Sequence, residues 1–255
     1  MVLYVENDQM GTDPKFNISN LVYYPILVLV CLEIALLILG YRPYRNTDYS
    51  INAAPQNAFI GHSELGIQLN PGKYTITIND SLSFTTNHIG PMERAMNAKD
   101  SVRPQIAMLG CSYTYGLGVN DGDHFPALLQ TEFPQASFFQ RAVLGHGTVQ
   151  SLLELRQLIN ETSLNTVLLN LSSFHLMRNT LSPTYRSYLR IGYGHSDKQV
   201  ESMMHTSRFP YIETCGDPVQ YIPWSEIYDH WMGREWLATI NWIQSTYDRW
   251  QEDQE

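Results

Sequence analysis

Residues 106–119 read IAMLGCSYTYGLGV and carry the clearest signal in the chain. The apolar run at the start predicts a short buried strand, and the glycines after it predict a sharp turn in which the backbone can come close to a ligand. Ser112 lies directly after the strand, where its hydroxyl stands clear of the sheet edge. Open α/β sheets have their ligand sites at these carboxyl ends of strands. Ser112 is therefore a candidate nucleophile.

The same pattern of strand, turn and helix recurs along the chain. Residues 140–150 read QRAVLGHGTVQ, and an apolar run over 167–171 continues into SSFHLMRN at 172–179. We predict strands over 104–109, 137–143 and 166–171, helices near 123–131 and 147–160, and a last long helix over 233–250. Such alternation predicts an α/β protein whose parallel sheet is covered by helices on both faces.

The first two of these blocks resemble the motifs of the GDSL/SGNH hydrolases, in particular their membrane-anchored bacterial branch. In the first family block, Gly-Asp-Ser-x-Thr-x-Gly, Cys111 stands in place of the aspartate. In the second, Asn-x-x-Val-x-Gly-x-Gly, Gln140 stands in place of the asparagine. The resemblance covers roughly residues 60–190, and the matching positions are Ser112, Thr114, Gly116, Val143, Gly145 and Gly147.

This resemblance implies a three-layer α/β/α, flavodoxin-like fold and a serine ester hydrolase that needs no metal or cofactor. Ser112 is then the nucleophile that forms an acyl-enzyme. The backbone N–H groups of Ser112 and Gly145 are the implied oxyanion hole, because donors beside glycines can approach the developing negative charge. The implied substrate is a small-molecule or glycan ester, such as an acylated surface glycan or a lipid.

Two parts of the family pattern are not matched. The third block lacks an obvious asparagine, and Asn170, Ser172, Ser173 and His175 are all candidate substitutes. The C-terminal Asp-x-x-His, whose histidine takes the serine proton in the family, is not found. We therefore expect a sheet that is short of strands and one helix face that is poorly covered. The alternative function is a truncated or non-catalytic SGNH-like domain that binds a glycan or a protein partner.

Several residues compete for the roles of base and nucleophile. His175, at the end of the third strand, is the candidate base that we retain, although it could instead bridge loops. His146 is either an alternative base or a structural hydrogen-bonding residue. Cys111 is an alternative nucleophile beside Ser112, and a disulfide between Cys111 and Cys215 is possible.

Other polar and aromatic features have a structural and a functional interpretation. The stretch 121–124, Asp-Gly-Asp-His, has the spacing of the missing block, but its position before a helix favours an aspartate N-cap. Residues 228–230, Tyr-Asp-His, are interpreted as a helix surface, and Arg178 either pairs with a substrate anion or is structural. A set of aromatic residues stacks on a sugar or, as we favour, packs in the core: Tyr211, Tyr221, Trp224, Tyr228, Trp231, Trp236, Trp242 and Trp250.

Residues 21–39, LVYYPILVLVCLEIALLIL, have the length and apolarity of a transmembrane helix with tyrosines at both ends. Glu33 is the exception, since an acid inside a bilayer costs roughly 2 to 3 kcal/mol unless it is paired. We favour a single-pass membrane anchor over a buried packing helix or a cleaved signal peptide. Arg42 and Arg45 favour a cytoplasmic α/β domain, whereas the family resemblance favours an extracytoplasmic one, which we retain.

Composition restricts the class of protein further. The 255 residues are 44% apolar, carry a formal net charge of −9 and include three cysteines. The acidic balance excludes nucleic acid as a partner, and no zinc-type Cys/His spacing occurs. We expect a polar tail over 1–19, the anchor over 20–41, a linker over 42–60 and the α/β domain over 61–255. Within that domain, 74–78 and 82–86 are predicted to form a hairpin around Asn79-Asp80. Nothing in the sequence specifies the oligomeric state.

Overall fold

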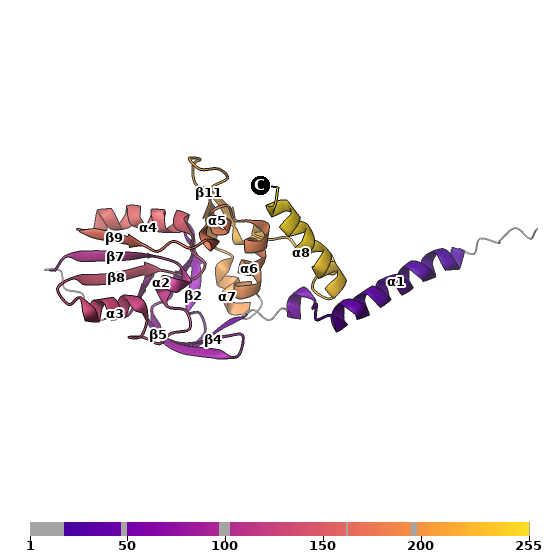
Figure 1. Cartoon of the computed structure of the whole chain (residues 1–255), viewed down its shortest axis with the longest axis horizontal. Coiled ribbons are helices and arrows are strands. Elements are labelled where there is room, and N and C mark those ends of the chain that lie inside the picture. The colour runs from indigo at the N-terminus through magenta and orange to yellow at the C-terminus, as the bar shows by residue number, and fades with distance from the viewer. Residues whose placement is uncertain (1–17, 47–49, 97–102, 162, 195–197, 255) are drawn as a thin grey trace, which may run out of the picture.

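The computed structural model describes residues 18–46, 50–96, 103–161, 163–194 and 198–254. Its α/β part is built on a parallel three-stranded sheet in the order β8–β7–β9, with β7 over Gln105–Gly110, β8 over Ser137–Ala142 and β9 over Thr166–Leu169 (Figure 1). The three strands that the sequence predicted are thereby confirmed. The protein is a mixed α/β structure with a parallel sheet.

Helices cover both faces of this sheet because its side chains alternate. Ala107 and Leu109 of β7 pack with Leu158 of α4, Thr148–Glu161. Met108 points to the opposite face, in the cluster that includes Leu129 of α3, Phe125–Glu132. The two helices expected near 123–131 and 147–160 are therefore confirmed.

Strand β9 lies at an edge of the parallel sheet and is incompletely covered. Leu168, Leu169 and the following Leu171 are all exposed. Leu168 and Leu169 line a shallow cavity with Phe125 and Asn170. Among the described residues the parallel sheet thus has three strands, and its edge strand β9 has exposed side chains on both faces.

A second, antiparallel sheet has the order β1–β4–β5–β6. Strands β4, Gly72–Ile78, and β5, Leu82–Gly90, form the predicted hairpin, and Asn79 and Asp80 both have a φ of 51° at its turn. They belong to the three-residue loop 79–81, and asparagine and aspartate tolerate such positive φ values well. Strand β1, Ile51–Ala54, pairs with β4. Part of the segment 42–60, expected to be a linker, is therefore an ordered strand of this sheet.

The main hydrophobic core joins this antiparallel sheet to the loops at the carboxyl end of β8. Hairpin β2–β3, Phe59–His62 and Gly66–Leu69, and hairpin β10–β11, Arg208–Tyr211 and Gln220–Pro223, both contribute to it. The remaining elements around it are α5 over Phe174–Asn179, α6 over Pro183–Gly194, α7 over Lys198–Met204 and the short helix η2 over Trp224–Glu226.

Arg94, in the two-residue strand β6 (Glu93–Arg94), is fully buried and uses all five of its N–H donors. Its Nε donates to Asp121 Oδ1 at 2.7 Å. Its two terminal nitrogens donate to four backbone carbonyls, those of Thr85, Tyr115, Gly116 and Val119. Three of those carbonyls belong to the turn that follows Ser112, so a single cation ties this turn to the antiparallel sheet.

The long helices near the two ends of the described chain meet at the start of α8 and then diverge (Figure 1). Helix α1, Ile18–Ile38, extends away from the body, and α8, Ala238–Glu252, begins beside its C-terminal half and packs on α6 (Figure 1). The predicted last helix thus starts five residues later than expected, at Ala238 rather than Gly233. Within the part of the chain that the structure describes, no helix is both long and apolar enough to cross a membrane.

Arg234 joins the segment after α1 to the C-terminal region. Its guanidinium lies 4.7 Å from the ring centroid of the buried Tyr44, and its carbonyl accepts the Tyr44 N–H at 3.1 Å. It also donates to Asn241 of α8 and to the Tyr228 hydroxyl. Residues 228–230, interpreted from the sequence as a helix surface, lie instead in the loop between η2 and α8, where Tyr228 packs against this cation.

We predict that Arg94→Met lowers the free energy of unfolding by about 3–5 kcal/mol, because it leaves buried carbonyls and Asp121 without their donor. The measurement is urea unfolding of the full chain in detergent, followed by far-UV circular dichroism. Arg156→Met, on the exposed face of α4, is the matched control and should change stability little. Equal losses in the two variants would contradict the role given to Arg94.

Candidate functional site

Ser112 begins a four-residue helix, α2 (Ser112–Tyr115), directly after β7. Cys111 is its N-cap residue, in extended conformation, and Gly116 ends it in the left-handed region at φ +79°. At Gly110, a Cβ would lie only 2.2 Å from the Thr114 hydroxyl oxygen, so no larger residue fits beneath this turn. The sharp turn that the sequence predicted after the strand is therefore present.

The second block forms the loop between β8 and α4. Gly145 has a φ of +78°, and a Cβ there would lie 2.9 Å from the Tyr185 hydroxyl, which donates to the Gly145 carbonyl. At Gly147, a Cβ would lie 2.5 Å from Asn179 Oδ1. Both glycines are thus required for the loop to approach α5 and α6 closely.

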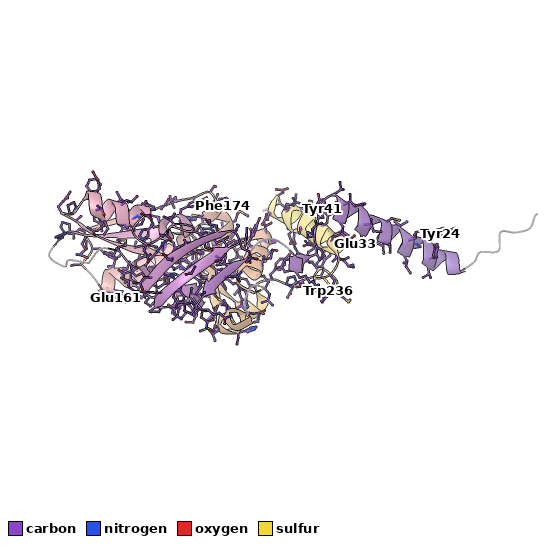
Figure 2. All side chains as sticks on the ribbon, turned by 90° about the horizontal axis from the view of Figure 1, so that it is seen from below. Tyr24, Glu33, Tyr41, Glu161, Phe174 and Trp236 are labelled. Carbon is purple, nitrogen blue, oxygen red and sulfur yellow. The ribbon has the colours of Figure 1, made fainter. Side chains whose placement is uncertain are left out.

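Ser112 and Gly145 line one cavity of about 390 Å³ between these loops and α5 and α6. Within the described part of the chain, no backbone carbonyl accepts the N–H of either residue. The cavity wall is mostly apolar and aromatic, and its volume is in the range of small-molecule sites. The other lining residues are Tyr113, Leu117, Leu144, Phe174, Met177, Arg178, Thr184, Tyr185, Tyr188, Leu189 and Tyr193. Phe174, labelled in Figure 2, marks the α5 side.

His175 does not reach the wall of this cavity. It is buried at the start of α5. Its ring lies by the side chain of Cys111, which is itself 1% exposed. The structure therefore brings His175 next to the residue that precedes Ser112.

Cys111 has an unusual electrostatic environment. Burial by itself raises the pKa of its thiol, but the His175 ring, the Tyr113 N–H and the Arg178 guanidinium outweigh burial and lower the pKa to about 6. Cys31, Cys111 and Cys215 are all free, so the possible disulfide between Cys111 and Cys215 is not formed. The strand end at Ser112 therefore favours negative charge.

Arg178 is the only cationic side chain on the described cavity wall. It donates to the His146 carbonyl at 3.0 Å, and its guanidinium lies 5.8 Å from the ring centroid of Tyr185. Its interpretation as a structural residue is thus supported, while its place on the wall also allows contact with a bound anion.

His146 has a structural role. Its Nε2 lies 3.0 Å from the carbonyl oxygen of Ile67, and burial lowers the pKa of the ring to about 4. It does not line the cavity. Of its two interpretations, the structural hydrogen bond is the one that the geometry supports.

The acidic residues considered from the sequence lie away from the cavity. Asp121 binds Arg94, and the N-cap of α3 is His124, whose Nδ1 accepts the Ala127 N–H at 3.2 Å. The expected aspartate cap is therefore wrong, because α3 begins at Phe125 and its N-cap position is occupied by His124. No group of three His, Cys, Asp or Glu side chains able to hold a metal ion occurs among the described residues.

No pattern in the sequence indicated that α6 would form part of the wall. Helix α6 folds back across the carboxyl ends of the strands, and this places five of its residues on the wall: Thr184, Tyr185, Tyr188, Leu189 and Tyr193. Their spacing is that of any amphipathic helix face.

Comparison of this chain with protein-family models, with curated proteins and with solved structures finds no match.

We predict that the thiolate absorbance of Cys111 at 240 nm, taken as the difference between the unmodified chain and Cys111→Ser, appears with a midpoint near pH 6. His175→Phe should raise that midpoint, because it removes a group that lowers the pKa and leaves the burial that raises it. The control is the same difference for the exposed Cys215→Ser. A Cys111 midpoint at the usual value of about 8.5 or above would contradict this environment.

Proposed function

We propose that this protein is an ester hydrolase of the SGNH type, with Ser112 as its nucleophile. The observation that carries the proposal is the shared cavity: Ser112 and Gly145, from two loops 33 positions apart, line one apolar space at the carboxyl ends of adjacent parallel strands. The substrate is an ester with an apolar acyl group, such as an acylated glycan or a lipid.

In the proposed reaction, Ser112 Oγ attacks the ester carbonyl carbon and the alcohol leaves with a proton, which gives an acyl-enzyme that water then hydrolyses. The N–H groups of Ser112 and Gly145 stabilise the oxyanion, since no backbone carbonyl occupies them within the described residues. Arg178 adds positive charge on the same wall. The three-layer SGNH topology belongs to the same proposal.

His175 is the proposed base. It lies beside the immediate neighbour of Ser112, because its ring contacts the Cys111 thiol. Because the ring is behind the cavity wall, proton transfer requires that the Ser112 hydroxyl or the His175 ring turn toward the other.

One observation favours the second candidate function, a non-catalytic domain that binds an acylated ligand. Among the described lining residues there is no histidine, aspartate or glutamate. An apolar cavity with one arginine can hold an amphiphilic anion without carrying out chemistry on it.

We also propose that residues 21–39 anchor the chain in a membrane as a single pass, with the α/β domain on the extracytoplasmic side. The sequence supports the anchor through its apolar run with tyrosines at both ends. Protease protection in right-side-out vesicles tests the orientation: digestion of the α/β domain by added protease supports it, and protection contradicts it.

Labelling with a fluorophosphonate probe discriminates between the two functions. We expect the detergent-solubilised chain to be labelled, Ser112→Ala to abolish labelling, and His175→Phe to slow it by about 10²–10⁴-fold, the usual contribution of a general base. Ser225→Ala, which removes an exposed serine that does not line the cavity, is the matched control. No labelling of a folded protein would support the binding function instead.

Cys111→Ala in the same assay separates the two candidate nucleophiles. We expect it to retain labelling, because Cys111 is buried and does not line the cavity. Loss of labelling in Cys111→Ala with retention in Ser112→Ala would assign the nucleophile to the thiol.

A further inference from the structure

Large apolar side chains are exposed around the start of α8. We refer to six of these exposed residues together as the tryptophan surface: Trp231, Met232, Trp236, Leu237, Trp242 and Ile243. Met232 is 96% exposed. The expectation that the C-terminal aromatic residues pack in the core holds for Trp224, which is 1% exposed, but is wrong for these tryptophans. Packing within the described chain therefore does not explain why these apolar side chains are exposed.

Glu33 connects this surface to α1. Its carboxylate accepts the N–H groups of Ala238 and Thr239, both at 2.8 Å, and the Thr239 hydroxyl at 2.7 Å. The first N–H groups of a helix have no partner inside the helix, and an acidic group there is favoured by the helix dipole. The one acid in the apolar run of α1 is thus the cap of α8, and it holds the tryptophan surface beside α1. Figure 2 shows Glu33 and Trp236 in this region.

The position of Glu33 along α1 sets the depth of this contact. Leu39, the end of the apolar run, lies six positions after Glu33. Six positions correspond to about 9 Å along a helix axis. Interfacial helices bury their apolar face roughly 5–10 Å into the headgroup and acyl boundary. If 21–39 spans a bilayer, α8 begins at the depth where interfacial helices lie.

The polar groups next to the tryptophan surface fit a lipid headgroup region. The Arg45 guanidinium lies 4.1 Å from the ring centroid of Trp236, and Arg42 is exposed at the end of α1. Tryptophan is enriched at membrane interfaces because its ring is apolar and its N–H is polar. The basic side chains are then placed to meet lipid phosphates.

We propose that the tryptophan surface lies in the interface of the bilayer that α1 enters, so that the start of α8 is a second, peripheral membrane contact fixed by Glu33. This inference rests on the proposed membrane anchor and not on the proposed hydrolase activity. The occupant of the surface is the phospholipid layer, rather than a protein or a second copy of this chain.

The test is fluorescence quenching by brominated lipid. The full chain, carrying Ser112→Ala so that hydrolysis plays no part, is reconstituted into phosphatidylcholine–phosphatidylglycerol vesicles with or without phosphatidylcholine brominated near the top of its acyl chains. One variant keeps only Trp236 and a matched control keeps only the buried Trp224, with the other tryptophans changed to phenylalanine. Circular dichroism establishes that both are folded.

We expect brominated lipid to quench most of the Trp236 emission and little of the Trp224 emission. Glu33→Leu in the Trp236 variant should reduce the quenching, because α8 loses its cap, whereas Cys31→Leu on the same helix should leave it unchanged. Equal quenching of Trp236 and Trp224 in vesicle-bound protein overturns the inference. So does shielding of Trp236 from aqueous acrylamide in detergent at high but not at low protein concentration, which would assign the surface to a second copy.

Resistance to alkaline carbonate extraction distinguishes the two membrane proposals. A chain that is extracted contradicts both the anchor and the inference. A chain that resists extraction, but whose Trp236 is not quenched, retains the anchor and overturns the interfacial role of α8. Ser112-dependent labelling is unaffected by either result.

Discussion

The buried guanidinium of Arg94 is the interaction on which the candidate site depends most. A positive charge excluded from water is tolerated only when its donors are all satisfied, and Arg94 meets this condition with Asp121 and four backbone carbonyls. Because three of those carbonyls follow Ser112 in the chain, the same bonds that satisfy the cation also fix the turn. This turn fixes the direction in which α2 leaves β7. The antiparallel sheet, which carries no residue of the cavity wall, thereby acts as the support of the site.

The electrostatic properties of the candidate site depend on its mostly apolar wall. An apolar cavity strengthens any electrostatic interaction within it, so in the proposed reaction Arg178 and the N–H groups of Ser112 and Gly145 would act strongly on the developing negative charge. The low pKa of the Cys111 thiol is an indication of the same local potential, since it arises partly from His175 and Arg178. Cys111 itself occupies the position where the resembling family has an aspartate.

The contact between Glu33 and α8, like that of Arg94, pairs a charged group with backbone groups that need a partner. A carboxylate within an apolar helix is costly unless it is paired, and the unpaired N–H groups at a helix start are costly when they leave water. Bringing the two together satisfies both with three hydrogen bonds of 2.7 to 2.8 Å. Two segments separated by about two hundred residues are thereby placed side by side. Trp236, next to the start of α8, consequently lies by the C-terminal end of α1 and stacks with Arg45.

The parallel strands, the helices α3 and α4, the β4–β5 hairpin and the glycine-dependent turns around Ser112 and Gly145 were all predictable from the sequence, because each depends on local periodicity or on the backbone freedom of a few residues. Four features were decided by the tertiary structure alone: the wall that α6 adds to the cavity, the position of His175 behind Cys111 rather than on that wall, the replacement of the aspartate cap of α3 by His124, and the pairing of Glu33 with α8. In each of these a polar or aromatic side chain finds a partner far away in sequence. Local pattern shows that such a group requires a partner, but only the packed chain determines which one is within reach.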